Sequence, residues 1–265
     1  MFLTICFISL SLALSAQSVR VMSMNIKEGG KPALHRVAPY AEVINEYKPD
    51  FVCLQEVDHR TMRNGGKDFL GELAEKTGMF PYFCQSIVYQ GGGFGVAILS
   101  RYPFYKAQKQ IAKIDGARED RATGWVYVML PNGKKIRVAS THLALESESI
   151  TSKNIALLNA SIFEDKKTPT LLIGDFNCTP DSGPLEYAKI KWQEIGAGSG
   201  FTIPSDKPTR QLDYVMGYPK NKWHSKSYNI IAKPNLSDHC FIVADVEYEE
   251  SPYFFFLQFP ARRIL

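Results

Sequence analysis

Short apolar segments along the chain repeatedly run into an acidic, amide or histidine residue, and this pattern restricts the fold more than any other feature. The segment from Phe51 to Leu54, for example, is apolar enough to be a buried strand, and Glu56 follows it. A carboxylate at such a position must be hydrated, paired or bound to a cation, because burial of an unpaired charge costs too much free energy. Comparable strand ends carry Asn25, His142, Asp175 with Asn177, Asp213, and Asp238 with His239. Together they predict one oxygen-rich pocket that holds a hard cation such as Mg²⁺ or Mn²⁺ beside a pair of histidines.

The order of strand-like and helix-like segments predicts one globular domain, with two sheets packed face to face and helices outside. Apolar runs and alternating patterns predict strands at 19–24, 51–55, 82–89, 95–100, 123–130, 136–141, 170–173, 212–216, 225–231 and 241–246. Helical spacing of apolar residues predicts helices at 33–47, 67–77 and 150–163. The glycine run at 91–93 lacks the Lys-Ser/Thr sequel of a phosphate-binding loop, and it predicts a flexible loop between strands.

The composition is that of an ordinary globular protein with a full hydrophobic core. Of 265 residues, 45% are hydrophobic and 22% are charged. The net charge of +4 is too small to indicate nucleic-acid binding by itself. A local basic rim could still steer a phosphate ester towards a site, because the shape of the field matters more than the net charge.

The first residues, Met1 to Ala16, are uncharged and largely apolar, with small residues at Ala13 and Ser15. We interpret this segment as a secretory signal peptide, since it is short for a transmembrane helix and polar sequence follows from Gln17. A membrane anchor and a mis-assigned start are the alternatives, because no Lys or Arg lies near Met1. A signal peptide would make the mature protein secreted or periplasmic.

Four cysteines, Cys53, Cys84, Cys178 and Cys240, follow the predicted signal peptide. An even number is compatible with export but does not establish disulfides. Cys53 and Cys240 lie in apolar, strand-like segments, which predicts buried free thiols. No spacing among the cysteines matches a zinc motif, so we expect no structural zinc.

At these strand ends the sequence resembles the endonuclease/exonuclease/phosphatase superfamily, which includes deoxyribonuclease I, AP endonucleases, neutral sphingomyelinases and inositol polyphosphate 5-phosphatases. The motifs occur in the family's order, and the segment 95–103 resembles a family core strand. The resemblance extends from Val19 to Val246. It implies an α/β (α+β) four-layer sandwich of two mostly antiparallel sheets flanked by helices, in a domain spanning 17–250. It is strong for the superfamily and weak for the substrate, because enzymes with very different ligands share this fold.

The resemblance implies that Glu56 is the primary metal ligand, with Asn25 and Asp238 as further candidates. Mg²⁺ binds proteins through one or two carboxylates while keeping several waters, so a small set of ligands is sufficient. Alone, Glu56 would more simply be a surface carboxylate in an ion pair, and Asn25 or Asp238 a turn residue that binds backbone. The presence of the other motifs favours metal binding.

The resemblance also implies a proton-transfer group built around two histidines. His239 is the candidate general base or transition-state contact, and Asp213 matches the carboxylate that fixes its tautomer and raises its basicity. Asp213 could instead cap the turn before the strand that follows it. His142 resembles the second family histidine, which contacts the scissile phosphate or serves the leaving group.

Asp175 and Asn177 lie two positions apart after a buried strand, and in extended geometry this spacing turns both side chains to one face. By resemblance, Asp175 orients or deprotonates the attacking water, and Asn177 donates a hydrogen bond to a phosphoryl oxygen. An Asx-rich turn is the alternative. Arg121 lies where some family members have a phosphate-binding arginine, although an arginine beside Glu119 and Asp120 is commonly a solvated ion pair.

These residues predict a Mg²⁺- or Mn²⁺-dependent phosphoesterase that uses activated water to hydrolyse a phosphodiester, in nucleic acid or another phosphate diester. A phosphomonoesterase, a lipid or inositol-phosphate headgroup hydrolase, and a catalytically silent binding domain are the alternatives. No stable protein partner is implied, and we expect a monomer. The aromatic run in 251–265 departs from the family and has no functional interpretation.

Overall fold

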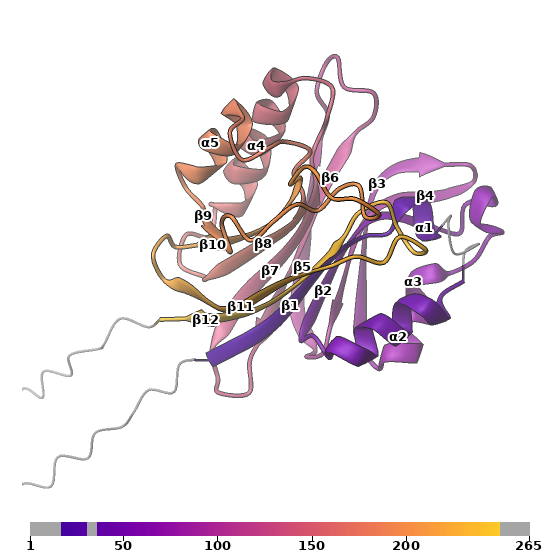
Figure 1. Ribbon diagram of the computed structural model, residues 1–265, viewed down its shortest axis with the longest axis horizontal. Helices are drawn as coiled ribbons and strands as arrows, with labels where there is room; N and C mark the ends of the chain where they lie inside the picture. The colour runs from indigo at the N-terminus through magenta and orange to yellow at the C-terminus, as the bar shows by residue number, and fades with distance from the viewer. Residues whose placement is uncertain (1–16, 31–35, 250–265) are drawn as a thin grey trace, which may run out of the picture.

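The computed structural model describes residues 17–30 and 36–249, which form two six-stranded β-sheets packed face to face (Figure 1). The first sheet has the order β11 (Trp223–Ile231), β12 (Phe241–Tyr248), β1 (Gln17–Asn25), β2 (Phe51–His59), β4 (Gly92–Ser100) and β3 (Phe80–Tyr89). The second has the order β5 (Phe104–Ala112), β6 (Arg121–Met129), β7 (Lys135–His142), β8 (Thr170–Asp175), β10 (Asp213–Tyr218) and β9 (Gln193–Ile195). Only β1–β2 and β7–β8 are parallel pairs, so the prediction of two mostly antiparallel sheets is confirmed.

Three sequence-based predictions fall wholly or partly outside the described residues. The predicted signal peptide, 1–16, and the aromatic segment, 251–265, are two of them. The third is the first part of the predicted helix at 33–47, of which α2 (Ala38–Tyr47) is described.

Helices cover the outer face of each sheet, which completes the four layers. The helices α2 and α3 (Phe69–Thr77) lie on the first sheet, and α4 (Glu148–Ile162) and α5 (Gly183–Lys189) lie on the second (Figure 1). Two shorter elements lie at the ends of strands. The helix α1 (Lys27–Gly30) follows β1, and the 3₁₀ turn η2 (Met62–Asn64) lies between β2 and α3. Within the described ranges, no helix has the length and apolar character that a membrane crossing requires.

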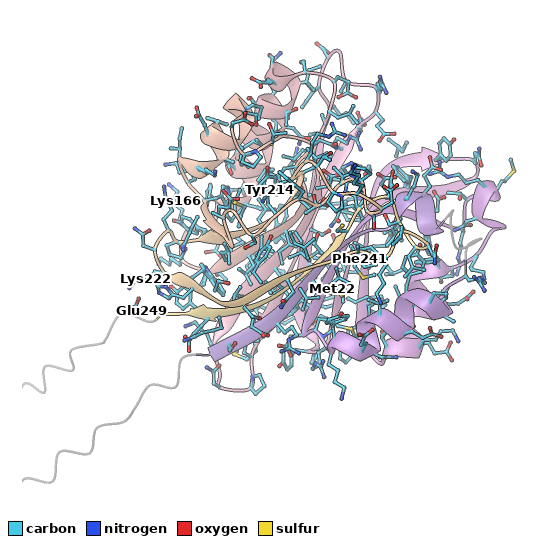
Figure 2. The ribbon with its side chains drawn as sticks, in the orientation of Figure 1. Met22, Lys166, Tyr214, Lys222, Phe241 and Glu249 are labelled. Atoms are coloured by element: carbon cyan, nitrogen blue, oxygen red, sulfur yellow. The ribbon has the colours of Figure 1, made fainter. Side chains whose placement is uncertain are left out.

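Alternation along the strands explains why the layers stack. Side chains of a strand point to opposite faces in turn, so Val21 and Phe51 pack between the sheets while Met22 faces the helices. In the second sheet, Val215 faces inward and Tyr214 packs against α4 and α5. Figure 2 labels Met22 and Tyr214, one on each sheet. The core therefore consists of one apolar layer between the sheets and one beneath each pair of helices.

The structure corrects two sequence-based expectations. The glycine run at 91–93 is no loop, because Gly92 and Gly93 begin β4 and only Gly91, with φ +78°, lies in the turn. A Cβ atom on Gly92 would lie 2.4 Å from the carbonyl oxygen of His59, so close strand pairing requires glycine there. The edge strand β5 was not predicted, because only one of its nine residues is buried and its sequence shows no regular apolar pattern.

The cysteines behave as structural apolar residues. All four in the described part of the chain are buried and free, which confirms the prediction for Cys53 and Cys240. Burial raises the pKa of each thiol above its ordinary value. The thiols therefore carry little thiolate at neutral pH.

Gly174 sets the position of the acidic strand end that follows it. Its φ is +147°, and a Cβ atom there would lie 2.0 Å from the carbonyl oxygen of Thr141 on the parallel strand β7. Only glycine satisfies both the backbone conformation and this close approach. The position of Asp175 therefore depends on a residue without a side chain.

Replacement Gly174→Ala is expected to destabilise the fold by at least about 2 kcal/mol, since backbone strain and a steric collision both act there. Gly133→Ala is a matched control, because Gly133 also has a positive φ, +83°, but has open space around it. The control should cost only about 1 kcal/mol. Urea denaturation of both variants measures the difference, and equal losses would contradict the collision.

Candidate active site

One row of polar residues crosses the second sheet at the ends of three strands. The strand β8 lies between β7 and β10, and Asp175 pairs with both His142 and Asp213 in the register of the sheet. All three residues are buried. Hydrogen-bond register alone therefore brings together two carboxylates and an imidazole from distant parts of the chain.

The facing sheet supplies the opposing row. Asn25, at the end of β1, pairs with Gln55, the residue before Glu56. A bulge interrupts the pairing of β2 with β4 between Leu54 and Val57, and Glu56 within it has a φ of +57°. The site thus lies at the end of the sandwich opposite the start of β1 (Figure 1).

The amide of Asn25 links two carboxylates across the two sheets. Its Nδ2 donates to Oε1 of Glu56 at 3.0 Å and to Oδ2 of Asp175 at 3.1 Å. Burial raises the pKa of Glu56, and the hydrogen bond from Asn25 only partly opposes this effect. A buried carboxylate in this situation is stabilised by a nearby cation.

Asp238, the third predicted metal ligand, lies in a different environment. Its carboxylate forms an ion pair with the ammonium group of Lys27, which follows Asn25 by two residues. The backbone N–H of Lys27 donates to Oδ1 of Asn25 at 3.1 Å. Metal binding by Asp238 stays a prediction, and it would require the carboxylate to share its charge with Lys27.

His239 has the carboxylate partner that the sequence predicted. Its Nδ1 lies 2.9 Å from Oδ2 of Asp213, and its Nε2 lies 3.7 Å from Oδ2 of Asp175. Burial alone would lower the pKa of His239, but the nearby carboxylates, Asp213 foremost, raise it above its ordinary value. A protonated imidazole held by Asp213 therefore faces Asp175.

His142 is held in the opposite charge state. Burial, with the positive charge of Arg121 and then that of His239, lowers its pKa well below the ordinary value. Nη1 of Arg121 lies 3.3 Å from Nδ1 of His142, and a guanidinium can only donate, so Nδ1 accepts. The ring is therefore neutral with its proton on Nε2, which lies 3.5 Å from Oδ2 of Asp175.

Arg121 contacts protein groups rather than open solvent. Its side chain is 7% exposed, and Nη1 lies 2.9 Å from Oε1 of Glu119. It pairs with an acidic neighbour, but the guanidinium is buried and not solvated as the alternative interpretation expected, and it also fixes the orientation of His142. Direct contact of Arg121 with a phosphate stays a prediction.

Asp175 lies at the centre of the site. Burial, with a further contribution from the charge of Asp213, raises its pKa above the ordinary value. The backbone N–H of Asn177 donates to Oδ1 of Asp175 at 2.8 Å, and Nδ2 of Asn177 donates to the carbonyl of Leu143 at 2.9 Å. Asn177 has a φ of +50° and lies in the Asx-type turn that follows β8. Its side-chain bond to Leu143 connects this turn to the residue after β7. A hydrogen bond from Asn177 to a phosphoryl oxygen stays a prediction.

Two residues that support the site were not singled out from the sequence. Lys27 pairs with Asp238. Ser237 joins the end of β1 to the loop before β12, because its Oγ donates to the carbonyl of Asn25 at 2.6 Å and accepts from the backbone N–H of His239 at 3.0 Å. Both lie within two residues of predicted site residues. Proximity in sequence was the available signal, but their contacts depend on the tertiary fold.

The donor set fits a hard divalent cation. Two groups of side chains in the described ranges place their ligand atoms within 4.8 Å of one another: Glu56, His142 and Asp175, and Asp175, Asp213 and His239. The first group contains the predicted primary ligand Glu56, with Asn25 hydrogen-bonded to it. Its carboxylate oxygens suit Mg²⁺ and Mn²⁺. The neutral ring of His142 has no free nitrogen for a cation, because Nδ1 accepts from Arg121 and Nε2 carries the proton.

Comparison with known proteins agrees with this geometry. The model of the endonuclease/exonuclease/phosphatase family matches residues 22–239, which include every predicted site residue. The chain belongs to this family. Its members are typically hydrolases of phosphate esters and generally depend on a divalent metal.

The relatives of this family member show how widely the fold is used. The uncharacterized protein YbhP of Escherichia coli K12 is 29% identical over 248 residues, which cover 86% of this chain and 96% of YbhP. The mannosyl-6-phosphatase Bt3783 of Bacteroides thetaiotaomicron has a TM-score of 0.72 at 14% identity, covering 86% of this chain and 99% of the other. The human Nocturnin catalytic domain has a TM-score of 0.70 at 20% identity, covering 88% and 95%. At these identities the two structures support the fold alone.

Proposed function

We propose that this family member is a Mg²⁺- or Mn²⁺-dependent phosphoesterase that hydrolyses a phosphodiester with activated water. The observation that carries the proposal is the amide of Asn25, which is hydrogen-bonded to half-buried Glu56 and to buried Asp175 beside the His239–Asp213 pair. A site for cation binding and a site for proton transfer thus share Asp175. Water attack on phosphorus requires both functions within a few ångströms.

Each residue would have a separate role in the reaction, and its charge state would determine that role. When bound, a divalent cation supplies positive charge that stabilises the developing charge on the phosphoryl oxygens. Asp175, whose pKa is raised, is suited to orient the attacking water and accept its proton. His239, kept protonated by Asp213, is suited to donate a hydrogen bond to a phosphoryl oxygen. Neutral His142 keeps its Nε2 proton and can donate a hydrogen bond to the same group or to the leaving oxygen.

Metal-dependent turnover of bis-p-nitrophenyl phosphate tests the proposal. We expect hydrolysis with Mg²⁺ or Mn²⁺, loss of turnover with EDTA, and recovery with excess metal. EDTA should leave the melting temperature nearly unchanged, because three apolar layers rather than a metal hold the fold together. Unfolding on chelation would instead indicate a structural metal, and turnover that resists EDTA would contradict metal dependence.

A phosphomonoesterase is the second candidate. The similarity in fold to a mannosyl-6-phosphatase favours it, since that protein is named for a monoester substrate. Parallel assays with p-nitrophenyl phosphate and bis-p-nitrophenyl phosphate separate the two candidates. A strong preference for the monoester would replace the diesterase proposal while keeping the site.

We also propose that the protein is exported, on the basis of the uncharged apolar segment from Met1 to Ala16. The mature chain should then begin near Gln17 or Ser18. N-terminal sequencing of protein from the periplasm or culture medium measures this directly. A mature chain that keeps Met1 would contradict the proposal.

A further inference from the structure

A pocket of about 410 Å³ lies beside the site, and Asn177 lines it. Three segments form its walls: the stretch that leads into α4, with Leu145 and Glu148, the turn after β8 together with the start of α5, and the end of the loop before β10 with Arg210 and Leu212. Its volume is at the small end of the range for ligand pockets. It therefore has room for one monomeric group rather than for a length of polymer.

Buried hydrogen bonds hold these walls together. The hydroxyl of Tyr214 lies 2.8 Å from the carbonyl oxygen of Cys178 and 3.2 Å from that of Gln211, which joins the second wall to the third. The side chain of Asn177 donates to the carbonyl of Leu143, which joins the second wall to the first. The pocket is thus formed before any ligand binds.

Two opposite charges line the pocket without pairing with each other. Within the described part of the chain, no ion pair or side-chain hydrogen bond involves Glu148 or Arg210. The backbone of Arg210 is nevertheless fixed, because its carbonyl accepts from the N–H groups of Thr202 at 2.7 Å and Ile203 at 3.0 Å. The hydroxyl of Thr151, by contrast, is used within the fold, since it donates to backbone carbonyl oxygens.

This combination of groups matches a polyhydroxylated alcohol. A hydroxyl donates to a carboxylate and accepts from a guanidinium, so a ligand with several hydroxyls can form hydrogen bonds with both Glu148 and Arg210. Leu145 and Leu212 offer apolar surface for the C–H groups of such a ligand. The carboxylate of Glu148 disfavours a second phosphate in the pocket, because like charges repel.

We propose that this pocket binds the hydroxylated alcohol of the phosphate ester, with Arg210 and Glu148 as specificity-determining residues. This inference rests on the proposed function. The substrate would then be a small phosphate ester of a sugar, a cyclitol or a nucleoside. Simple alkyl phosphate esters should bind less well. A site built to hydrogen-bond substrate hydroxyls discriminates against analogues that lack them, because its polar groups are then left without partners.

The test compares p-nitrophenyl phosphodiesters that share one leaving group and differ in the second alcohol: myo-inositol, glucose (through its 6-hydroxyl), thymidine (through its 5′-hydroxyl) and 1-hexanol. We expect at least one hydroxylated ester to exceed the hexyl ester in kcat/KM by about tenfold or more. Arg210→Gln and Glu148→Gln should each lower that ratio by about tenfold, mainly through KM, as expected for loss of ground-state binding. The preferred ester identifies the source of the alcohol.

Two exposed lysines provide matched controls. Lys207→Ala removes a charge from the loop that carries Arg210, and Lys153→Ala removes one from α4 away from this pocket. Both should leave the ratio unchanged. Equal kcat/KM for the hydroxylated and hexyl esters, or variants that lower all esters alike, would overturn the inference while the proposed function stands. Absence of turnover with every ester, bis-p-nitrophenyl phosphate included, would overturn both.

Discussion

Replacement His239→Ala is expected to lower turnover by about 10²- to 10⁴-fold, the usual contribution of a positioned proton-transfer group. The imidazole is buried and lies 2.9 Å from Asp213, whereas His142, which also faces Asp175, is held by Arg121 in the neutral state. The fold should persist, because His239 lies in the loop before β12 and not in the apolar layers. Steady-state kinetics with bis-p-nitrophenyl phosphate measures the loss, and His224→Ala, at an exposed histidine on β11, is the control.

Asp213→Asn tests whether the carboxylate and the imidazole act as one unit. It should lower turnover by a similar factor and leave metal binding nearly intact, and His239→Ala should cost at least as much. Because the carboxylate raises the pKa of His239, its removal should lower that pKa, which NMR titration of the ring in metal-free protein measures. The double variant should lose less than the product of the two single losses. Strictly multiplicative losses would show that the two residues act independently.

Replacement Glu56→Gln is expected to weaken metal binding and activity together. The amide keeps the shape of the carboxylate and one oxygen that can accept from Asn25, but it replaces the other oxygen by a donor and removes the charge. Mg²⁺ binds through few carboxylates, so the loss of one should matter. Excess Mg²⁺ should therefore recover part of the lost turnover. Titration with Mn²⁺ followed by electron paramagnetic resonance measures affinity separately from activity.

Glu42→Gln, at an exposed position on α2, is the matched control for the loss of one negative charge. It should change neither metal affinity nor turnover. The Glu56→Gln variant should also keep or gain stability in the metal-free protein, because burial already raises the pKa of Glu56 and opposes its charge. Unchanged activation by metal would remove Glu56 from the cation site.

Secondary structure was predictable where the residues themselves carried the pattern. The segment from Phe51 to Leu54 is apolar because both of its faces are buried, one between the sheets and one beneath α2 and α3. The edge strand β5 carries no such pattern, because solvent covers much of it and its pairing with β6 is made by backbone groups. A pattern of side chains cannot report an interaction that the backbone makes.

The sequence by itself determined the chemical inventory of the site, since polar residues at the ends of apolar strands must be hydrated, paired or bound to a cation. The tertiary structure determined which of these residues contact one another and which of them are charged. The register of β7, β8 and β10 puts Asp175 between His142 and Asp213. Asp213 raises the pKa of His239, while burial, with the charge of Arg121, lowers the pKa of His142. The tertiary structure also brings Lys27 into an ion pair with Asp238. Charge states depend on distances between strands that are remote in sequence, and those distances exist only once the two sheets have packed.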